Sequence, residues 1–216
     1  MATHSLIVEQ FRRPSGPAGH LAGWIMAHRA SNRERNRWTV SLLGIESGDR
    51  VLELGFGPGV ALGLAVQATG PSGHVVGIDH SPAMLAQASR RHRRLVADGR
   101  LELHLMTVAE AHAADWCFDR IFSSNVLQFE TDALKVLSGL RRILRPGGRI
   151  ATTFQPRLRS STSDHARRFG EDIVRHKTEA GFVGARAFVL QVDPLPAVCV
   201  VAEAPSVASI SPDRAA

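Results

Sequence analysis

Short apolar runs alternate with longer amphipathic segments through most of the chain. Segments 60–69, 81–96 and 132–144 carry apolar side chains at helical spacing. Ser81 and Pro82 supply a capping hydroxyl followed by a proline, which is typical of a helix start. Strands that alternate with such helices predict βαβ units and a parallel sheet. The apolar runs that predict strands are 51–54, 74–79, 101–106, 120–124, 149–153, 187–192 and 197–203.

The last two strands differ in their connection. A predicted helix over 164–180 precedes them, and only Asp193-Pro194-Leu195-Pro196 joins them. This link is too short for a helical crossover, so the two strands should be antiparallel. The fold class predicted is therefore α/β: a doubly wound, Rossmann-like, seven-stranded, mostly parallel sheet with a C-terminal antiparallel hairpin.

The length of 216 residues predicts one domain, with three parts. Residues 1–37 should form an N-terminal helical lid, in which 19–28 is a short apolar helix. Residues 38–204 should form the Rossmann-like core, and 205–216 a loose tail. Ser31 or Asn32 is placed to cap the helix that leads into the core.

Composition narrows the class of protein. Hydrophobic residues make up 44% of the chain and charged residues 21%, as in ordinary globular proteins. No apolar run approaches the roughly 18 residues that span a bilayer, and the first residues lack the pattern of a secretory signal. Two cysteines are too few for a disulfide framework. We expect a cytoplasmic protein with no membrane span.

The chain is basic, with a formal net charge of +6, and all but two of its 26 cationic residues are arginines. The densest run, Arg90-Arg91-His92-Arg93-Arg94, lies at the end of a predicted helix, where cations complement the helix dipole. We interpret this run as a solvated helix end and do not expect nucleic-acid binding. The oligomeric state is left open.

The most informative segment is Val51-Leu52-Glu53-Leu54-Gly55-Phe56-Gly57-Pro58-Gly59, a buried strand that ends in three alternating glycines. Alternating glycines allow a sharp turn and a close approach of backbone to ligand. The next apolar run ends in Asp79, at the place where doubly wound folds bind ribose hydroxyls. Together these features predict a nucleoside-containing cofactor.

The residues around the turn favour one cofactor over another. Val60 stands where the dinucleotide fingerprint has its third glycine. Glu53 would repel a pyrophosphate but suits an ammonium group. The pattern Glu53-x-Gly55-x-Gly57-x-Gly59 with Asp79 resembles motif I of the class I S-adenosylmethionine-dependent methyltransferases. The resemblance extends over about 38–203 and includes Arg145-Pro146-Gly147-Gly148.

The resemblance implies S-adenosyl-L-methionine as cofactor and assigns parts of its site. Backbone of the glycine turn would contact the methionine part, and Asp79 would accept both ribose hydroxyls. Thr107 stands where the family usually has an acid that meets adenine; Thr107 itself, Glu110 or the backbone of Val108 and Ala109 can substitute. The predicted cofactor-binding residues are Glu53, Gly55, Phe56, Gly57, Gly59, Asp79, His80, Met84, Thr107, Val108, Ala109, Ser123 and Asn125.

The acceptor site is less defined. Trp24, Gln128 and Phe129 are candidates for stacking on or contacting a small-molecule substrate, and Arg157 or Arg159 for holding an anion. No catalytic base is identified; His20 and His28 of the lid are candidates. No Pro-Pro follows Asn125, which argues against base N-methylation, and Asp119 lacks acidic partners, so we expect no metal.

Three functions remain open at this point. The favoured one is S-adenosylmethionine-dependent methyl transfer to a small molecule by in-line displacement. The alternatives are a non-catalytic, methyltransferase-like module that binds the cofactor or a partner, and an NAD(P)-dependent oxidoreductase.

Overall fold

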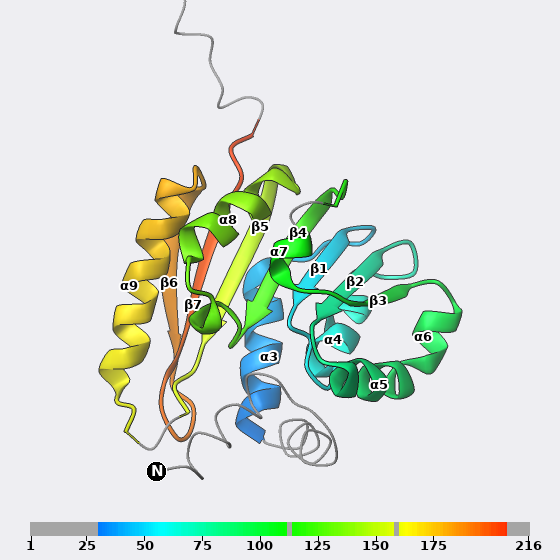
Figure 1. Ribbon diagram of the computed structural model, residues 1–216, viewed down its shortest axis with the longest axis horizontal. Coiled ribbons are helices and arrows are strands. Elements are labelled where there is room, and N and C mark those ends of the chain that lie inside the picture. Colours follow the sequence, from blue (N-terminus) through cyan, green and yellow to red (C-terminus); the bar gives the residue numbers. More distant parts are fainter. Residues whose placement is uncertain (1–29, 112–113, 158–159, 207–216) are drawn as a thin grey trace, which may run out of the picture.

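A seven-stranded sheet in the order β3-β2-β1-β4-β5-β7-β6 forms the centre of the molecule (Figure 1). The computed structural model describes residues 30–111, 114–157 and 160–206. Strands β1 to β5 pair in parallel, and β7 pairs antiparallel with β5 and β6. The predicted mostly parallel sheet with a C-terminal antiparallel hairpin is confirmed. The strands are β1 Arg50–Leu54, β2 His74–Asp79, β3 Leu101–Leu105, β4 Phe118–Ser124, β5 Leu144–Phe154, β6 Val183–Leu190 and β7 Ala197–Glu203.

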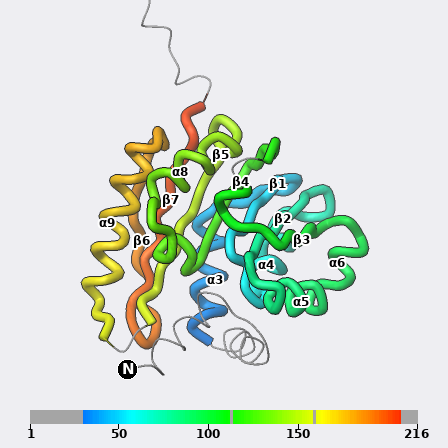
Figure 2. Tube along the Cα trace, in the orientation of Figure 1, coloured from blue at the N-terminus to red at the C-terminus, as the bar shows by residue number. Residues whose placement is uncertain are grey.

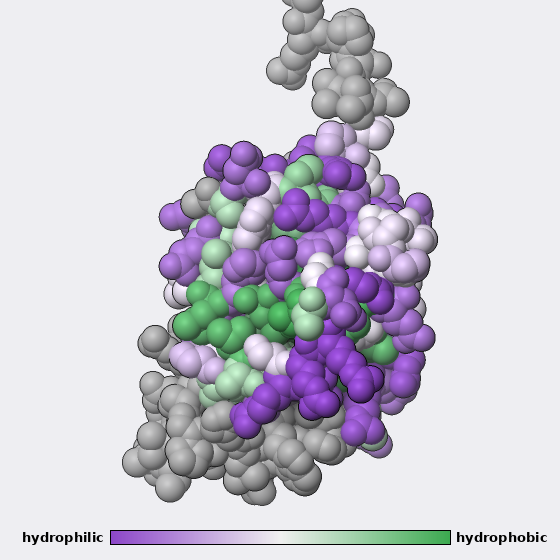
Figure 3. Space-filling view, turned by 90° about the vertical axis from the view of Figure 1, so that its right-hand side faces the viewer, coloured by the Kyte–Doolittle hydropathy of each residue, from purple (hydrophilic) through white to green (hydrophobic). Residues whose placement is uncertain are grey.

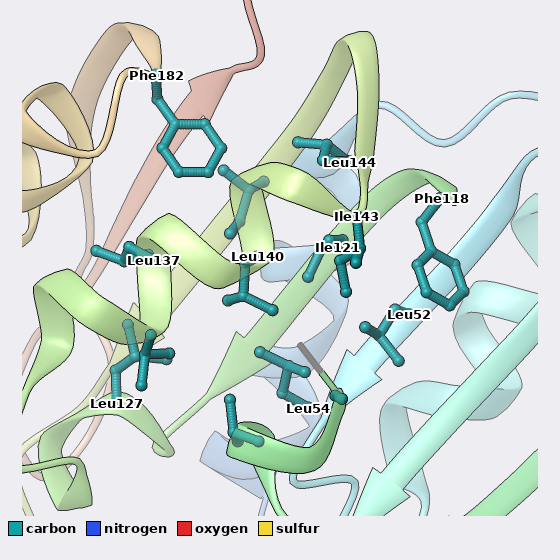
Figure 4. Packing of buried hydrophobic residues seen from close by; sticks show 14 of the residues in the cluster. Leu52, Leu54, Phe118, Ile121, Leu127, Leu137, Leu140, Ile143, Leu144 and Phe182 are labelled. Atoms are coloured by element: carbon teal, nitrogen blue, oxygen red, sulfur yellow. The ribbon is translucent and has the colours of Figure 1, made fainter. Parts of the chain in front are cut away.

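Helices cover both faces of the sheet because the parallel strands are apolar on both sides. Val51 packs into one core with side chains of α3, α4 and α5. Leu52 and Leu54 point to the other face and pack with α7, α8 and α9, as Figure 4 shows for Leu137 and Leu140 of α8. The helices are α3 Ala30–Leu43, α4 Val60–Ala68, α5 Pro82–Arg91, α6 Arg93–Ala97, α7 Val108–Ala111, α8 Ala133–Arg142 and α9 Ser163–Glu179, with a 3-10 turn η1 at Leu127–Phe129.

The strand order reverses between β1 and β4. The tube trace in Figure 2 runs outward from β1 through β2 to β3 and then returns to β4 on the other side of β1. In open α/β sheets such a switch point leaves a crevice at the carboxyl ends of the strands, where ligands bind. The glycine turn follows β1 at this point.

Several boundaries of helices and strands differ from those predicted. The helix expected over 81–96 is interrupted at His92, whose ring packs against the glycine turn and leaves α5 and α6 as separate helices. β5 begins at Leu144, five residues early, because Leu144 pairs with Phe118 before the kink at Pro146-Gly147. β6 begins at Val183. The expected lid boundary at 37/38 falls inside α3, so residues 30–37 continue the helix that packs on the sheet.

Figure 3 shows the side of the molecule that carries α5 and α6, where hydrophilic residues cover much of the surface beside a smaller hydrophobic area. Arg90, Arg91, Arg93 and Arg94 are all exposed there. Their exposure agrees with the interpretation of a solvated helix end. Among the described residues, no helix is both long and apolar enough to cross a membrane.

α9 buries a lysine against the hairpin. Lys177 is 0% exposed, and its Nζ donates hydrogen bonds to the carbonyl oxygens of Ile150 (3.2 Å) and Val200 (2.6 Å). Burial lowers the pKa of Lys177 to about 7, and the neighbouring Cys199 only partly opposes this effect. The charged ammonium is therefore disfavoured in the folded protein near neutral pH.

This burial predicts a stability that depends on pH. An unfolded lysine titrates near 10.5, so between about pH 7 and 10.5 the unfolded chain binds more protons, and the free energy of unfolding rises with pH. In denaturant titrations, the wild type should gain stability relative to Lys177→Met from pH 7 to 10. The exposed Lys135 provides the control variant Lys135→Met, which should follow the wild type. Parallel curves for the wild type and Lys177→Met would contradict the assignment.

Candidate functional site

The turn after β1 has a backbone conformation that requires glycine. Gly55, Gly57 and Gly59 have φ of +64°, +54° and +78°, in the region where other residues are strained. A Cβ at Gly55 would also lie 2.5 Å from Cγ2 of Val126. At Gly57 a Cβ would meet no heavy atom of the described residues within 4 Å. One side of the turn is thus packed, and the other is open to a ligand.

Asp79 fastens the turn to the end of β2. Its Oδ2 accepts a hydrogen bond from the backbone N–H of Gly57 (2.8 Å), and its Oδ1 accepts one from Ser81 (2.9 Å). The Gly55 N–H donates to the carbonyl of Ile78 at 2.8 Å. Burial raises the pKa of Asp79, although the hydrogen bonds from Ser81 and Gly57 work in the opposite direction. A carboxylate with fixed orientation therefore lies beside the open face of the turn.

Glu53 adds a second acid from β1. The side chain is 3% exposed, and its Oε2 has no hydrogen-bond partner among the described residues. Burial raises the pKa of Glu53 well above its ordinary value, and repulsion from Asp79 raises it further. A buried, unpartnered carboxylate costs free energy, and a bound cation would recover that cost.

The end of β4 is held in a special conformation. Asn125 is the one non-glycine residue in the described part of the chain with a positive φ, +58°. Its N–H donates to the carbonyl of Thr153 (2.8 Å), and its side chain exchanges hydrogen bonds with the backbone of Gln155 at 2.8 and 3.2 Å. Such strain persists only where surrounding contacts fix it. Val126, the next residue, packs over Gly55.

Other residues predicted to bind the cofactor lie in or near the glycine turn and the ends of β2 and β4. Phe56, Asp79, Met84 and Ser123 are buried, and Gly59 caps α4. His80 is exposed beside Asp79.

The residues predicted to contact the adenine follow β3, and they include no acid at position 107. Val108 and Ala109 belong to the short helix α7. Thr107 donates a hydrogen bond from its Oγ1 to Glu110 Oε2 (2.7 Å), and its N–H donates to the same oxygen at 2.7 Å. These bonds lower the pKa of Glu110. The carboxylate of Glu110 thus lies beside Thr107; its role at the adenine stays a prediction.

The predicted acceptor residues are only partly described. Gln128 and Phe129 lie on η1, which begins two residues after Asn125. Gln128 Oε1 is buried with no hydrogen-bond partner in the described part of the chain. Arg157 follows β5 and hydrogen-bonds Ser31 at 3.3 Å. His20, Trp24, His28 and Arg159 lie outside the described residues.

The one acid considered for a metal has structural partners. Asp119 accepts hydrogen bonds from the N–H of Arg50 (2.8 Å) and from Arg145 Nη1 (2.7 Å), near the start of β4. No cluster of three His, Cys, Asp or Glu residues suited to a metal occurs within the described ranges. The absence of a metal stays a prediction.

Sequence reasoning missed Arg35 of α3, a buried residue at the ends of β4 and β5. Its Nε donates to Ser124 Oγ (2.9 Å) and its Nη1 to Gln155 Oε1 (2.8 Å). The one available signal was its position: Arg35 lies on the same helical face as Thr39 and Leu43, where apolar residues are usual.

Comparison with known proteins supports the same class. A family model described as a methyltransferase domain matches residues 45–180. The uncharacterized methyltransferase YdaC of Bacillus subtilis is 33% identical over 190 residues, which cover 86% of this chain and 99% of YdaC. A ubiquinone/menaquinone biosynthesis C-methyltransferase of Pasteurella multocida is 30% identical over 119 residues, covering 55% of this chain and 44% of that protein.

A solved structure shares the fold. The N-methyltransferase NodS from Bradyrhizobium japonicum, in complex with S-adenosyl-L-homocysteine, has a TM-score of 0.64 and 19% identity, over 85% of this chain and 92% of NodS. The chain belongs to the methyltransferase domain family and is a class I S-adenosylmethionine-dependent methyltransferase.

Burying the carboxylate of Glu53 should lower the free energy of unfolding of the protein without ligand. Because its folded pKa is raised above the ordinary 4.5, the wild type loses unfolding free energy as pH rises above that value. Glu53→Gln should therefore be more stable than the wild type at pH 8, by roughly 1–3 kcal/mol, and the difference should shrink toward pH 4.5. Chemical denaturation at several pH values measures this difference.

The matched control is Glu34→Gln, at an exposed position of α3. It should leave stability unchanged. A Glu53→Gln protein that is less stable than the wild type at pH 8 would show that the carboxylate is satisfied in the folded state.

Proposed function

We propose that this chain binds S-adenosylmethionine across the carboxyl ends of β1 and β2 and transfers its methyl group to a small-molecule acceptor by in-line displacement. The observation that carries the proposal is the junction of the glycine turn with two buried acids, Glu53 and Asp79. Family membership supports the donor. The names of relatives, including the quinone-biosynthesis C-methyltransferase, support a small-molecule acceptor.

Each element of the junction suits one part of the donor. The open side of the turn at Gly57 lets backbone approach the methionine part. Asp79 uses each oxygen to accept one backbone N–H, and a carboxylate keeps further lone pairs that can accept ribose hydroxyls. Glu53 offers an unpartnered carboxylate to the ammonium of the amino acid tail. Met84 and His80 flank the adenine side.

The same features disfavour the oxidoreductase alternative. A dinucleotide carries a pyrophosphate, and its negative charge would further raise the free energy of ionising the two buried acids beside the turn. Val60, the first residue of α4, also stands where tight packing of helix on strand asks for glycine. S-adenosylmethionine has no phosphate and carries positive charge, so the acids attract it.

The chain's own residues would chiefly align the two reactants. The bound donor supplies a methyl group activated by positive sulfur. Asn125 is fixed by three hydrogen bonds and holds η1, with Gln128 and Phe129, at the end of β4 where an acceptor would lie. Alignment of this kind contributes about 7–11 kcal/mol to the lowering of a bimolecular barrier. The candidate bases His20 and His28 act only for an acceptor that must lose a proton.

The donor site predicts a specific binding defect. Asp79→Ala should weaken S-adenosyl-L-homocysteine binding at least about tenfold, because hydrogen bonds to a charged group contribute about 1.5–3 kcal/mol each. Isothermal titration calorimetry measures the affinity. Asp119→Ala removes another partly buried, hydrogen-bonded acid distant from the turn and serves as the control. Unchanged affinity in Asp79→Ala, or binding of NAD(H) by the wild type, would contradict the proposed site.

Turnover separates the enzyme from a binding module. Release of S-adenosylhomocysteine from S-adenosylmethionine should be detected with a member of a panel of phenols, amines and carboxylates. Tight donor binding without release for any acceptor would favour the non-catalytic alternative.

A further inference from the structure

The buried face of α3 changes character along the helix. Toward its C-terminal end it presents Val40 and Leu43 to the core. Toward its N-terminal end the equivalent positions carry polar side chains, all less than a tenth exposed: Asn32, Arg35, Asn36 and Thr39. This polar half packs at the ends of β4 and β5, since Thr39 Oγ1 lies 2.7 Å from Thr153 Oγ1. Polar groups in core positions indicate a site rather than packing.

Arg35 is the charged member of this group, and its partners are neutral. The guanidinium is 5% exposed and donates to Ser124 Oγ, Gln155 Oε1 and Asn32 Oδ1. No carboxylate is among its partners in the described part of the chain. By contrast, Arg120, Arg145, Arg149, Arg167 and Arg175 form ion pairs with acids that are at least 13% exposed. A buried charge without a counter-ion is costly, so the fold keeps Arg35 for a reason other than stability.

The guanidinium has donors left over. It carries five N–H groups, and three hydrogen bonds account for one on each nitrogen. Both terminal nitrogens therefore retain one N–H, and paired terminal N–H groups match a carboxylate or phosphate. Burial and the nearby Arg157 lower the pKa of Arg35 to about 9, so the group stays protonated at neutral pH. Two neighbouring cations attract an anion.

The position relates Arg35 to the acceptor side of the site. Ser124, its partner on β4, immediately precedes Asn125 and Val126, and Val126 covers Gly55. Gln155, its other partner, directly follows β5. The backbone of Gln155 is hydrogen-bonded to the side chain of Asn125, and its Nε2 donates to the carbonyls of Asp193 (3.1 Å) and Leu195 (2.9 Å). The proposed donor site, by contrast, is the glycine turn with Glu53 and Asp79, at the ends of β1 and β2. Arg35 thus lies next to the donor site, on the β4–β5 side of the switch point.

We propose that Arg35 binds an oxyanion, a carboxylate or phosphate, carried by the methyl acceptor. Ser124 and Gln155 hold the guanidinium in place, and Arg157 adds positive potential. The inference rests on the proposed function and narrows the acceptor to anionic small molecules. The acceptor's charge is neutralised beside the donor, at the ends of the strands where the reacting atoms would meet.

The first part of the test separates donor from acceptor. S-adenosylhomocysteine affinity is measured by calorimetry for the wild type, Arg35→Gln and Arg37→Gln; Arg37 is an exposed arginine on the same helix. All three should bind within about threefold of one another. Loss of binding in Arg35→Gln alone, with native circular dichroism, would make the donor's carboxylate its partner and overturn the proposal. Failure of the wild type to bind would refute the proposed function itself.

The second part probes the oxyanion directly. Malonate, citrate and inorganic phosphate are titrated at constant ionic strength, with and without saturating S-adenosylhomocysteine, and the thermal midpoint is recorded. At least one probe should raise the midpoint of the wild type and of Arg37→Gln in a saturable manner, with at least tenfold weaker affinity in Arg35→Gln. The Arg37→Gln protein experiences the same general salt effect, so the comparison removes it. Comparing the affinities for malonate and citrate with the affinity for phosphate shows whether a carboxylate or a phosphate is preferred.

A second variant covers the case in which Arg35→Gln does not fold. Ser124→Ala removes one neutral partner of the guanidinium and leaves its charge. This variant should bind the same oxyanion probe severalfold more weakly, while its affinity for S-adenosylhomocysteine stays unchanged. If no probe shifts the wild type, or if the shift survives in both Arg35→Gln and Ser124→Ala, the proposal is wrong.

Discussion

The carboxylate of Asp79 is the interaction on which the site depends. It receives N–H donors from Gly57, in the turn after β1, and from Ser81, at the start of α5. One side chain therefore fixes the geometry of two strand ends and one helix start. The Gly55 N–H also donates to the carbonyl of Ile78, but the N–H of Gly57, on the open side of the turn, donates to Asp79. Burial raises the pKa of Asp79, so this order comes at a cost in stability that a bound ligand would offset.

Charge is divided across the switch point of the sheet. Glu53 and Asp79 lie on the β1–β2 side, and both have raised pKa values because burial disfavours their charged forms. Arg35 and Arg157 lie on the β4–β5 side, and burial lowers the pKa of Arg35. Neither pair neutralises the other within the described contacts. Such an arrangement favours a cationic ligand on one side and an anionic one on the other, and both groups become less costly when these ligands bind.

Features defined by short stretches of sequence could be predicted, whereas features defined by contacts between distant residues could not. The glycine turn, Asp79 and the Ser81 cap were predictable because their defining contacts come from short segments or adjacent strand ends. Arg35 was not, since its partners Ser124 and Gln155 are 89 and 120 positions away and nothing in the chain distinguishes one arginine among many. The break at His92 was missed for the same reason: its ring contacts the carbonyl of Gly59, 33 residues earlier. The antiparallel hairpin, in contrast, follows from a short link alone.

A crystal structure with S-adenosyl-L-homocysteine tests the proposed donor site most directly. Both ribose hydroxyls should lie within hydrogen-bond distance of Asp79, the ammonium beside Glu53, and the methionine part against the backbone at Gly55 and Gly57. The sulfur should face the end of β4, next to Asn125. A nucleoside bound elsewhere on the sheet, or a ribose that contacts neither oxygen of Asp79, would contradict this site.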